Sequence, residues 1–238
     1  RIYINDGKAN FSKYPVRLPA YNGGAIAVSD FNNDGFDDIF LGSRSIPGSY
    51  GLSPFSFILL NNKRGGFGIL EKFRIGMVTD AKWIDINQDK FLDLVIVGDW
   101  MPVTILINQG NETFKNETNK YGLKNTSGMW NSITTHDIDN NGKDDLIIGN
   151  AGENLKFKAS KDSPIEVFIK DFDNNGRLDP IIFYNFLGNF VPFASKDKLD
   201  KQIPELKKKF TNYKSFSEVK SFYDLFEISR DSLVEYKK

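Results

Sequence analysis

Residues 30–38, DFNNDGFDD, begin a pattern that returns three times along the chain. The later copies are DINQDKFLD at 85–93, DIDNNGKDD at 137–145 and DFDNNGRLD at 171–179, and we number the four copies loops 1 to 4. Their first aspartates are 55, 52 and 34 residues apart, and an aliphatic or aromatic run follows each copy. Such runs predict strands, so each copy is expected to be a loop that joins two strands.

The units around these loops predict an all-β fold. Further strand-like runs at 57–60 and 67–73 follow loop 1, and others at 103–107 and 114 follow loop 2, which gives about four short strands per unit. A lone four-stranded sheet exposes both faces, so such units must stack, as the blades of a β-propeller do. A β-sandwich is the alternative, but its strands do not normally carry one acidic loop at a fixed place in each unit. We therefore expect about four propeller blades over residues 1–194.

The loops have the composition of calcium sites. Counted from the first aspartate, each offers side-chain oxygens at positions 1, 3, 5 and 9, as three carboxylates and one amide, and a backbone carbonyl at position 7. Ca²⁺ prefers such all-oxygen surroundings, and three crowded carboxylates would repel one another without a cation. The candidate ligands are Asp30, Asn32, Asp34, Phe36 and Asp38; Asp85, Asn87, Asp89, Phe91 and Asp93; Asp137, Asp139, Asn141, Lys143 and Asp145; and Asp171, Asp173, Asn175, Arg177 and Asp179.

Position 6 distinguishes one loop from the others. Gly35, Gly142 and Gly176 allow the sharp turn that this position needs, whereas loop 2 has Lys90 there. We expect up to four Ca²⁺ sites, with the Lys90 loop the weakest. The alternative is that Asp and Asn are merely turn residues that cap their own backbone. Four copies that keep one ligand count while exchanging Asp for Asn favour metal binding.

These loops, each followed by an aliphatic strand and, in three cases, a glycine (Gly42, Gly98, Gly149), resemble the FG-GAP or VCBS repeat of the integrin α-subunit propeller. The stretches at 28–35, 76–85, 98–103 and 171–180, and the tail at 201–210, are more similar still to bacterial VCBS-repeat proteins related to cartilage acidic protein, many of which carry an ASPIC/UnbV module. No such module is evident here. The resemblance implies a secreted or surface-exposed calcium-binding propeller of about seven blades, with flanking blades in the same longer chain. It implies no reaction.

Composition excludes several classes of protein. Lys+Arg and Asp+Glu are both 31, so a nucleic-acid partner is not expected. The apolar runs are far shorter than the roughly 20 residues that cross a bilayer. The absence of cysteine excludes disulfides, thiolate metal sites and cysteine nucleophiles. The sequence begins within a strand pattern, and we expect it to be a piece of a longer protein.

Few residues suggest catalysis. His136 is the only histidine, and it precedes a loop aspartate as a structural residue at a strand end would. Trp83, Trp100 and Trp130 are candidates for sugar stacking, although packing between blades is the commoner use of such residues. We expect a non-enzymatic, extracytoplasmic scaffold for adhesion or recognition of a protein or glycan ligand. A polysaccharide-handling enzyme or its carbohydrate-binding accessory domain is the alternative.

The tail at 195–238 changes character. Glycine disappears, lysine increases, and apolar residues follow Ser195 at helical spacing. Those residues are Leu199, Ile203, Leu206, Phe210 and Tyr213. A second helix is expected from about Ser217, with Val219, Phe222, Tyr223 and Phe226. We expect these helices to pack on the propeller without extending its sheets.

Overall fold

The computed structural model describes residues 2–15, 18–156 and 158–237 and is mostly β-structure in antiparallel sheets. The chain divides into two compact units, the first formed by 1–47 and 53–149 and the second by 48–52 and 150–238. The division does not coincide with the expected boundary at 195, because the C-terminal helices share a core with the strands that flank loop 4. The helices of the described residues are all too short or too polar to cross a bilayer.

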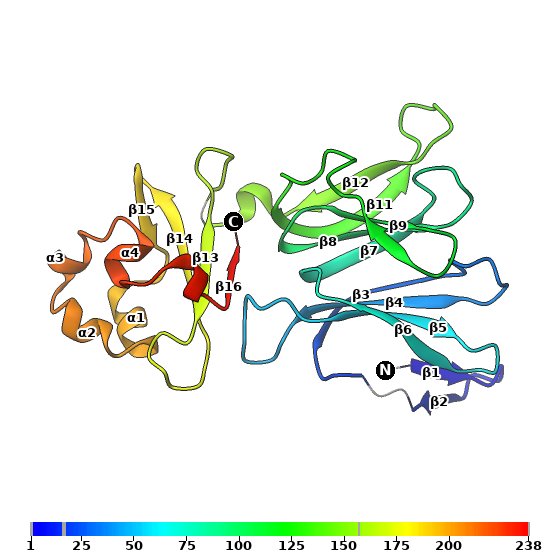
Figure 1. Cartoon of the computed structure of the whole chain (residues 1–238), viewed down its shortest axis with the longest axis horizontal. Helices are drawn as coiled ribbons and strands as arrows, with labels where there is room; N and C mark the ends of the chain where they lie inside the picture. The colour runs from blue at the N-terminus through cyan, green and yellow to red at the C-terminus, as the bar shows by residue number, and fades with distance from the viewer. Residues whose placement is uncertain (1, 16–17, 157, 238) are drawn as a thin grey trace. The chain divides into compact units, whose positions relative to one another are not determined.

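The first unit contains a complete four-stranded sheet (Figure 1). In spatial order its strands are β3 (Asn22–Ser29), β4 (Asp38–Ser45), β5 (Ser56–Asn61) and β6 (Phe67–Phe73). Loop 1 joins the first two of these strands, as the sequence predicts. β3 alternates in the way a half-buried strand does: Ala25 and Ala27 are buried, while Ile26 and Val28 are 66% and 55% exposed.

A larger sheet in the same unit contains the next two repeats. Its strands are β7 (Met77–Ile84), β8 (Asp93–Met101), β9 (Thr104–Asn108), β10 (Phe114–Asn116), β11 (Gly128–His136) and β12 (Asp145–Asn150). Loop 2 joins β7 to β8, and loop 3 joins β11 to β12. Four strands therefore follow one another around loop 2. The repeat of loop 3 contributes β11 and β12, after which a 3-10 turn, η1 (Gly152–Asn154), follows.

Adjacent repeats approach closely at a glycine of β3. A β-carbon on Gly24 of β3 would lie 1.8 Å from the carbonyl oxygen of Val78 in β7, so this position admits no side chain. Trp83 of β7 donates its indole N–H to the carbonyl of Ala27 at 3.2 Å. At the N-terminus, β1 (Ile2–Asn5) and β2 (Phe11–Tyr14) form a hairpin, and the Tyr14 hydroxyl accepts from the Phe67 N–H at 3.2 Å.

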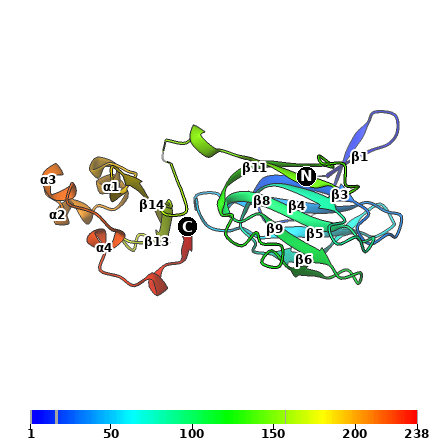
Figure 2. The same ribbon diagram turned by 90° about the horizontal axis from the view of Figure 1, so that it is seen from above.

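The second unit is one sheet with helices packed beside it. The strand order is β15 (Asn189–Pro192), β14 (Asp179–Phe186), β13 (Glu166–Lys170) and β16 (Glu235–Lys237), and loop 4 joins β13 to β14. Figure 2 shows the helices gathered beside β13 and β14. They are α1 (Lys196–Gln202), α2 (Leu206–Lys209), α3 (Tyr213–Phe216) and α4 (Phe222–Leu225), followed by η2 (Arg230–Ser232). Phe222 stacks on Phe168 of β13 with the ring centroids 4.0 Å apart.

The structure corrects the description of the tail in three respects. The first helix begins after Ser195, as predicted, but it ends at Gln202, because Pro204 cannot donate a helical hydrogen bond and forces Ile203 out of the helical region. The second predicted helix is reduced to α4, where Ser221 caps the N-terminus and Phe226 is already extended. The tail also extends a sheet, contrary to prediction, since β16 pairs with β13.

Candidate metal-binding loops

The four loops share one backbone hydrogen-bond pattern. The first aspartate accepts the N–H groups of positions 5 and 6, at 2.9 and 2.8 Å for Asp30 in loop 1. The side chain of position 5 accepts the N–H of position 7, at 3.0 Å for Asp34 in loop 1. The same bonds recur at Asp85, Asp89, Asp137, Asn141, Asp171 and Asn175. The aspartates and asparagines therefore turn their side chains inward around one tight turn.

Lys90 takes the backbone conformation that glycine takes in the other loops. Its φ is +75°, close to +86° at Gly35, +84° at Gly142 and +83° at Gly176. Its N–H donates to Asp85 at 2.9 Å, as the glycine N–H does elsewhere. A side chain in this left-handed region costs roughly 1 kcal/mol, so loop 2 keeps the turn at an energetic cost.

The aspartate at position 9 begins the strand that follows each loop and is the most buried candidate ligand of loops 1, 2 and 4. Asp38, Asp93 and Asp179 are buried, and Asp145 is half-buried. In loops 2, 3 and 4 this carboxylate accepts the N–H of position 2, at 2.9 Å from Ile86, 3.0 Å from Ile138 and 3.1 Å from Phe172. Burial raises the pKa of both Asp93 and Asp179.

Loop 1 differs at this position. Oδ1 of Asp38 accepts the Asn61 N–H at 2.8 Å, but Oδ2 is buried and has no hydrogen-bond partner among the described residues. Burial, together with the negative charges of Asp34, Asp30 and Glu112, raises the pKa of Asp38 to about 6. A cation in the loop would satisfy this oxygen, so the residues present fit a hard divalent ion such as Ca²⁺.

Loops 3 and 4 bring three carboxylates together. One oxygen each of Asp137, Asp139 and Asp145 lies within 4.8 Å of the others, and the same holds for Asp171, Asp173 and Asp179. Both loops carry aspartate at position 3, whereas loops 1 and 2 carry Asn32 and Asn87 there and place the third aspartate at position 5. The sequence predicts the same count of three carboxylates and one amide in every loop, and the structure brings the three carboxylates together in loops 3 and 4. The carbonyls of Phe36, Phe91, Lys143 and Arg177 stay predicted ligands.

Three residues beside loop 1 were not found from the sequence pattern. Lys63, in the turn after β5, places its ammonium 3.1 Å from Asp34. Partial burial acts to raise the pKa of Asp34, but the contact with Lys63 and the hydrogen bonds from Asn32 and Phe36 hold it below its usual range. Glu112, in the turn after β9, accepts from the Asn32 amide at 3.2 Å. Asn108 donates from its side chain to the Phe31 carbonyl at 3.0 Å. The sequence does carry a sign of these residues, because the turn that contains Lys63, at 61–67, is repeated at 108–114, where it contains Asn108 and Glu112.

Loops 1 and 2 also touch directly. The Asn33 side chain donates to the carbonyl of Lys90 at 3.1 Å. Loop 3 lies at the same end of its sheet as loop 2, because β11 runs antiparallel to β8 and its first residue, Gly128, pairs with Met101 at the far end of that strand. The three loops of the first unit therefore occupy one end of its strands.

Other candidate residues contribute less. Trp83 and Trp100 are 9% and 8% exposed, so they do not present a stacking platform. His136 is exposed at the end of β11.

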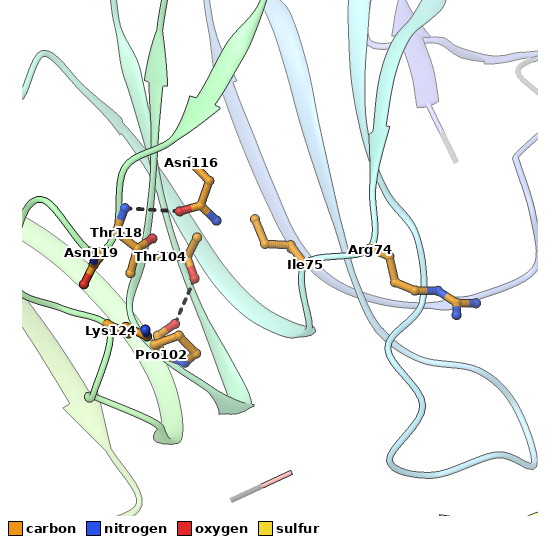
Figure 3. Close-up of a pocket in the computed structure, with 8 residues that line it drawn as sticks. All are labelled: Arg74, Ile75, Pro102, Thr104, Asn116, Thr118, Asn119 and Lys124. Carbon is orange, nitrogen blue, oxygen red and sulfur yellow. Dashed lines mark hydrogen bonds between the residues drawn. The ribbon is translucent and has the colours of Figure 1, made fainter. Parts of the chain in front are cut away.

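An open pocket of about 420 Å³ lies between Ile75, Thr104 and Thr118 (Figure 3). Arg74 points away from the other lining residues in that view. Two polar groups are already paired there, since the Thr104 hydroxyl donates to the Pro102 carbonyl and the Thr118 N–H donates to Asn116. The residues that line this pocket belong to the described part of the chain. They include the cations of Arg74 and Lys124 but no carboxylate.

Comparison with known proteins identifies the repeat. Residues 85–148, from the first ligand of loop 2 to β12, match the model of the FG-GAP-like repeat. FG-GAP repeats imply propeller blades, which agrees with the strands around loops 2 and 3. No curated protein matches the chain.

Proposed function

We propose that this chain is a calcium-binding β-propeller module, integrin-like in its blades, that acts outside the cytoplasm as a scaffold for adhesion or ligand recognition. The observation that carries the proposal is one loop conformation, with the side chain of the first aspartate turned inward, at the same place in four repeats, and a buried carboxylate at position 9 of three of them. The matched FG-GAP-like repeat supports the blade assignment. The ion would be held by the oxygens of positions 1, 3, 5, 7 and 9.

Electrostatics support a divalent ion. Loops 3 and 4 each bring three carboxylates together, and burial raises the pKa of the position 9 aspartates of loops 1, 2 and 4. These groups are costly to ionise in the metal-free protein. A bound Ca²⁺ removes that cost and offers the oxygens a partner, so the role of the ion is to stabilise each loop and the strands that it joins.

Exposed apolar residues on β3 support a place within a larger ring. Ile26 and Val28 face away from the buried side of their own strand and are more than half exposed. A preceding blade of the same longer chain, in a ring of about seven, would cover them. The proposal assigns no catalytic role, and the carboxylate clusters found among the described residues are those of loops 3 and 4.

Thermal unfolding in EDTA and after calcium repletion tests the metal. A ligand bound only by the native state adds about 2.7 kcal/mol per site at a hundredfold excess over Kd, so the midpoint should rise. Asp171→Asn with Asp179→Asn should lose part of this rise, and Asp162→Asn, which removes an exposed carboxylate outside the loops, should keep it. An unchanged midpoint on repletion of the unaltered protein contradicts calcium binding. A glycan array read with calcium and with EDTA tests recognition.

A further inference from the structure

We infer that Glu112, from the repeat of loop 2, is a positioning residue for the cation site of loop 1, so that this site is completed by the neighbouring repeat. The inference rests on the proposed calcium binding and adds a residue from outside the loop. Glu112 lies in the turn between β9 and β10, eighty residues from its contact, Asn32.

The contact helps to fix which atom of Asn32 faces the ion, together with Asp34 of the same loop, which also accepts from Nδ2 of Asn32, at 3.1 Å. Only the amide oxygen can bind a cation, and an amide side chain can turn either its oxygen or its nitrogen to a site. A carboxylate accepts hydrogen bonds only, so Glu112 accepts from Nδ2 of Asn32 at 3.2 Å. Oδ1 of Asn32 is then held toward the loop, where it accepts the Asp34 N–H at 3.2 Å. Outer carboxylates commonly orient metal ligands in this way.

The equivalent turn of the preceding repeat shows that the glutamate is not required by the turn itself. The turns at 61–67 and 108–114 close with the same hydrogen bond. Asn62 donates its N–H to the Gly66 carbonyl at 2.9 Å, and Gln109 donates its N–H to the Thr113 carbonyl at 2.9 Å. The position of Glu112 is occupied there by Gly65, with φ of +79° against +61° at Glu112. A glutamate thus stands where glycine is the unstrained residue, and its side chain meets loop 1.

The buried oxygen of Asp38 provides an independent sign of a ligand. Asp38 is fully buried, and its Oδ2 lacks a partner among the described residues. The charges of Asp34, Asp30 and Glu112 all act on this carboxylate, which places Glu112 among the carboxylates around it. Loop 2 has the same amide at position 3, and Asn87 donates to its own Asp89 just as Asn32 donates to Asp34. The additional contact, to a carboxylate of another repeat, is made by Asn32 of loop 1.

The test uses amide resonances that report each loop separately. In protein labelled with ¹⁵N-glycine, the signals of Gly35, Gly142 and Gly176 follow Ca²⁺ titration of loops 1, 3 and 4, because each N–H donates to the first aspartate of its loop. The variants are Glu112→Ala, which removes charge and acceptor, and Glu112→Gln, which keeps an acceptor. Asp37→Asn is the control, since it removes an exposed charge at position 8 of loop 1, which is not a candidate ligand, and leaves Asn32 in place.

Glu112→Ala should weaken Ca²⁺ binding at the Gly35 signal about tenfold, a usual cost of losing an outer partner, with Gly142 and Gly176 unchanged. Glu112→Gln should recover part of the loss, and the Asn32 side-chain NH₂ signal should move in the alanine variant. The inference is overturned if the Gly35 midpoint stays within twofold, if all three midpoints shift equally, or if Asp37→Asn has the same effect as Glu112→Ala. The inference is also overturned if, in the unaltered protein, the Gly35 signal alone does not respond to Ca²⁺. If none of the three signals responds, calcium binding itself is contradicted.

Discussion

The indole of Trp83 lies flat against the ring of Phe31, with the centroids 5.3 Å apart and the planes 11° from parallel. Phe31 is position 2 of loop 1 and Trp83 lies in β7, so the stack joins one repeat to the next. Phe114 contacts both rings at 5.3 and 5.9 Å. The residue after the first loop aspartate therefore anchors the loop in the core between two repeats, and the backbone geometry of the loop depends on that anchor.

Phe31→Ala should lower the free energy of unfolding by about 3–5 kcal/mol, the usual cost of removing a fully buried phenylalanine. Denaturant unfolding in calcium measures it. Phe36→Ala, in the same loop but with its side chain 43% exposed, serves as the control and should cost far less. Equal losses in the two variants would contradict the anchoring role.

Lys90→Gly should strengthen calcium binding at loop 2 and raise the free energy of unfolding by about 0.5–1 kcal/mol, because glycine adopts the +75° φ without strain. Two causes contribute to this effect, the positive charge of Lys90 and the strain of its backbone. Lys90→Ala separates them, since alanine removes the charge but keeps the strain. Calorimetric titration and denaturant unfolding of both variants measure the effects. If alanine stabilises the calcium-free protein as much as glycine does, strain at position 6 is not the cause.

Lys63→Ala should increase the calcium affinity of loop 1 a few-fold, because the ammonium that lies 3.1 Å from Asp34 competes with the ion for that carboxylate. The Gly35 amide signal reports the change. Arg64→Ala, which removes the neighbouring exposed cation in the same turn, should change the affinity less. A weaker site in Lys63→Ala would show that the lysine supports the loop.

The buried Asp38 should make the effect of calcium depend on pH. Its folded pKa, about 6, lies above the ordinary value of 3.8, so in calcium-free protein its stability contribution is fully present below 3.8 and is lost as pH rises through 6. Asp38→Asn should therefore be the more stable protein in EDTA at pH 7.5, and the advantage should fade at pH 4. In calcium the order should reverse, because the unaltered carboxylate binds the ion. Thermal melts of both proteins in EDTA at pH 7.5, in EDTA at pH 4 and in calcium measure these effects, and an advantage that persists at pH 4 would point to a cause other than ionisation.

Local patterns predicted the loops well because their geometry is set within nine residues. The place of each loop between two strands follows from the apolar runs on either side, and the conformation of Lys90 follows from the hydrogen bonds to Asp85. The end of the first tail helix before Pro204 could have been predicted from the proline itself. A proline interrupts a helix even where apolar residues such as Leu206 and Phe210 continue the helical spacing.

Contacts between distant residues could not be predicted in this way. Lys63 and Glu112 reach loop 1 only because β-strands place their turns beside it, and neither residue belongs to the acidic pattern. The strand at Glu235–Lys237 is three residues long and has no alternating pattern, so its pairing with β13 has no signature in the sequence.

The pairing of β16 with β13 has a consequence for the order of folding. One edge of β13 pairs with β14 directly across loop 4, where Lys170 lies opposite Asp179. Its other edge pairs with β16, where Lys237 lies opposite Val167, seventy positions earlier in the chain. Such distant pairing must close a long stretch of chain before it gains any contact, and it is slow for that reason. During synthesis on the ribosome, the strands β3 to β6 and β7 to β10 of the first unit can pair as adjacent hairpins when they emerge, while β13 keeps an open edge until β16 is made.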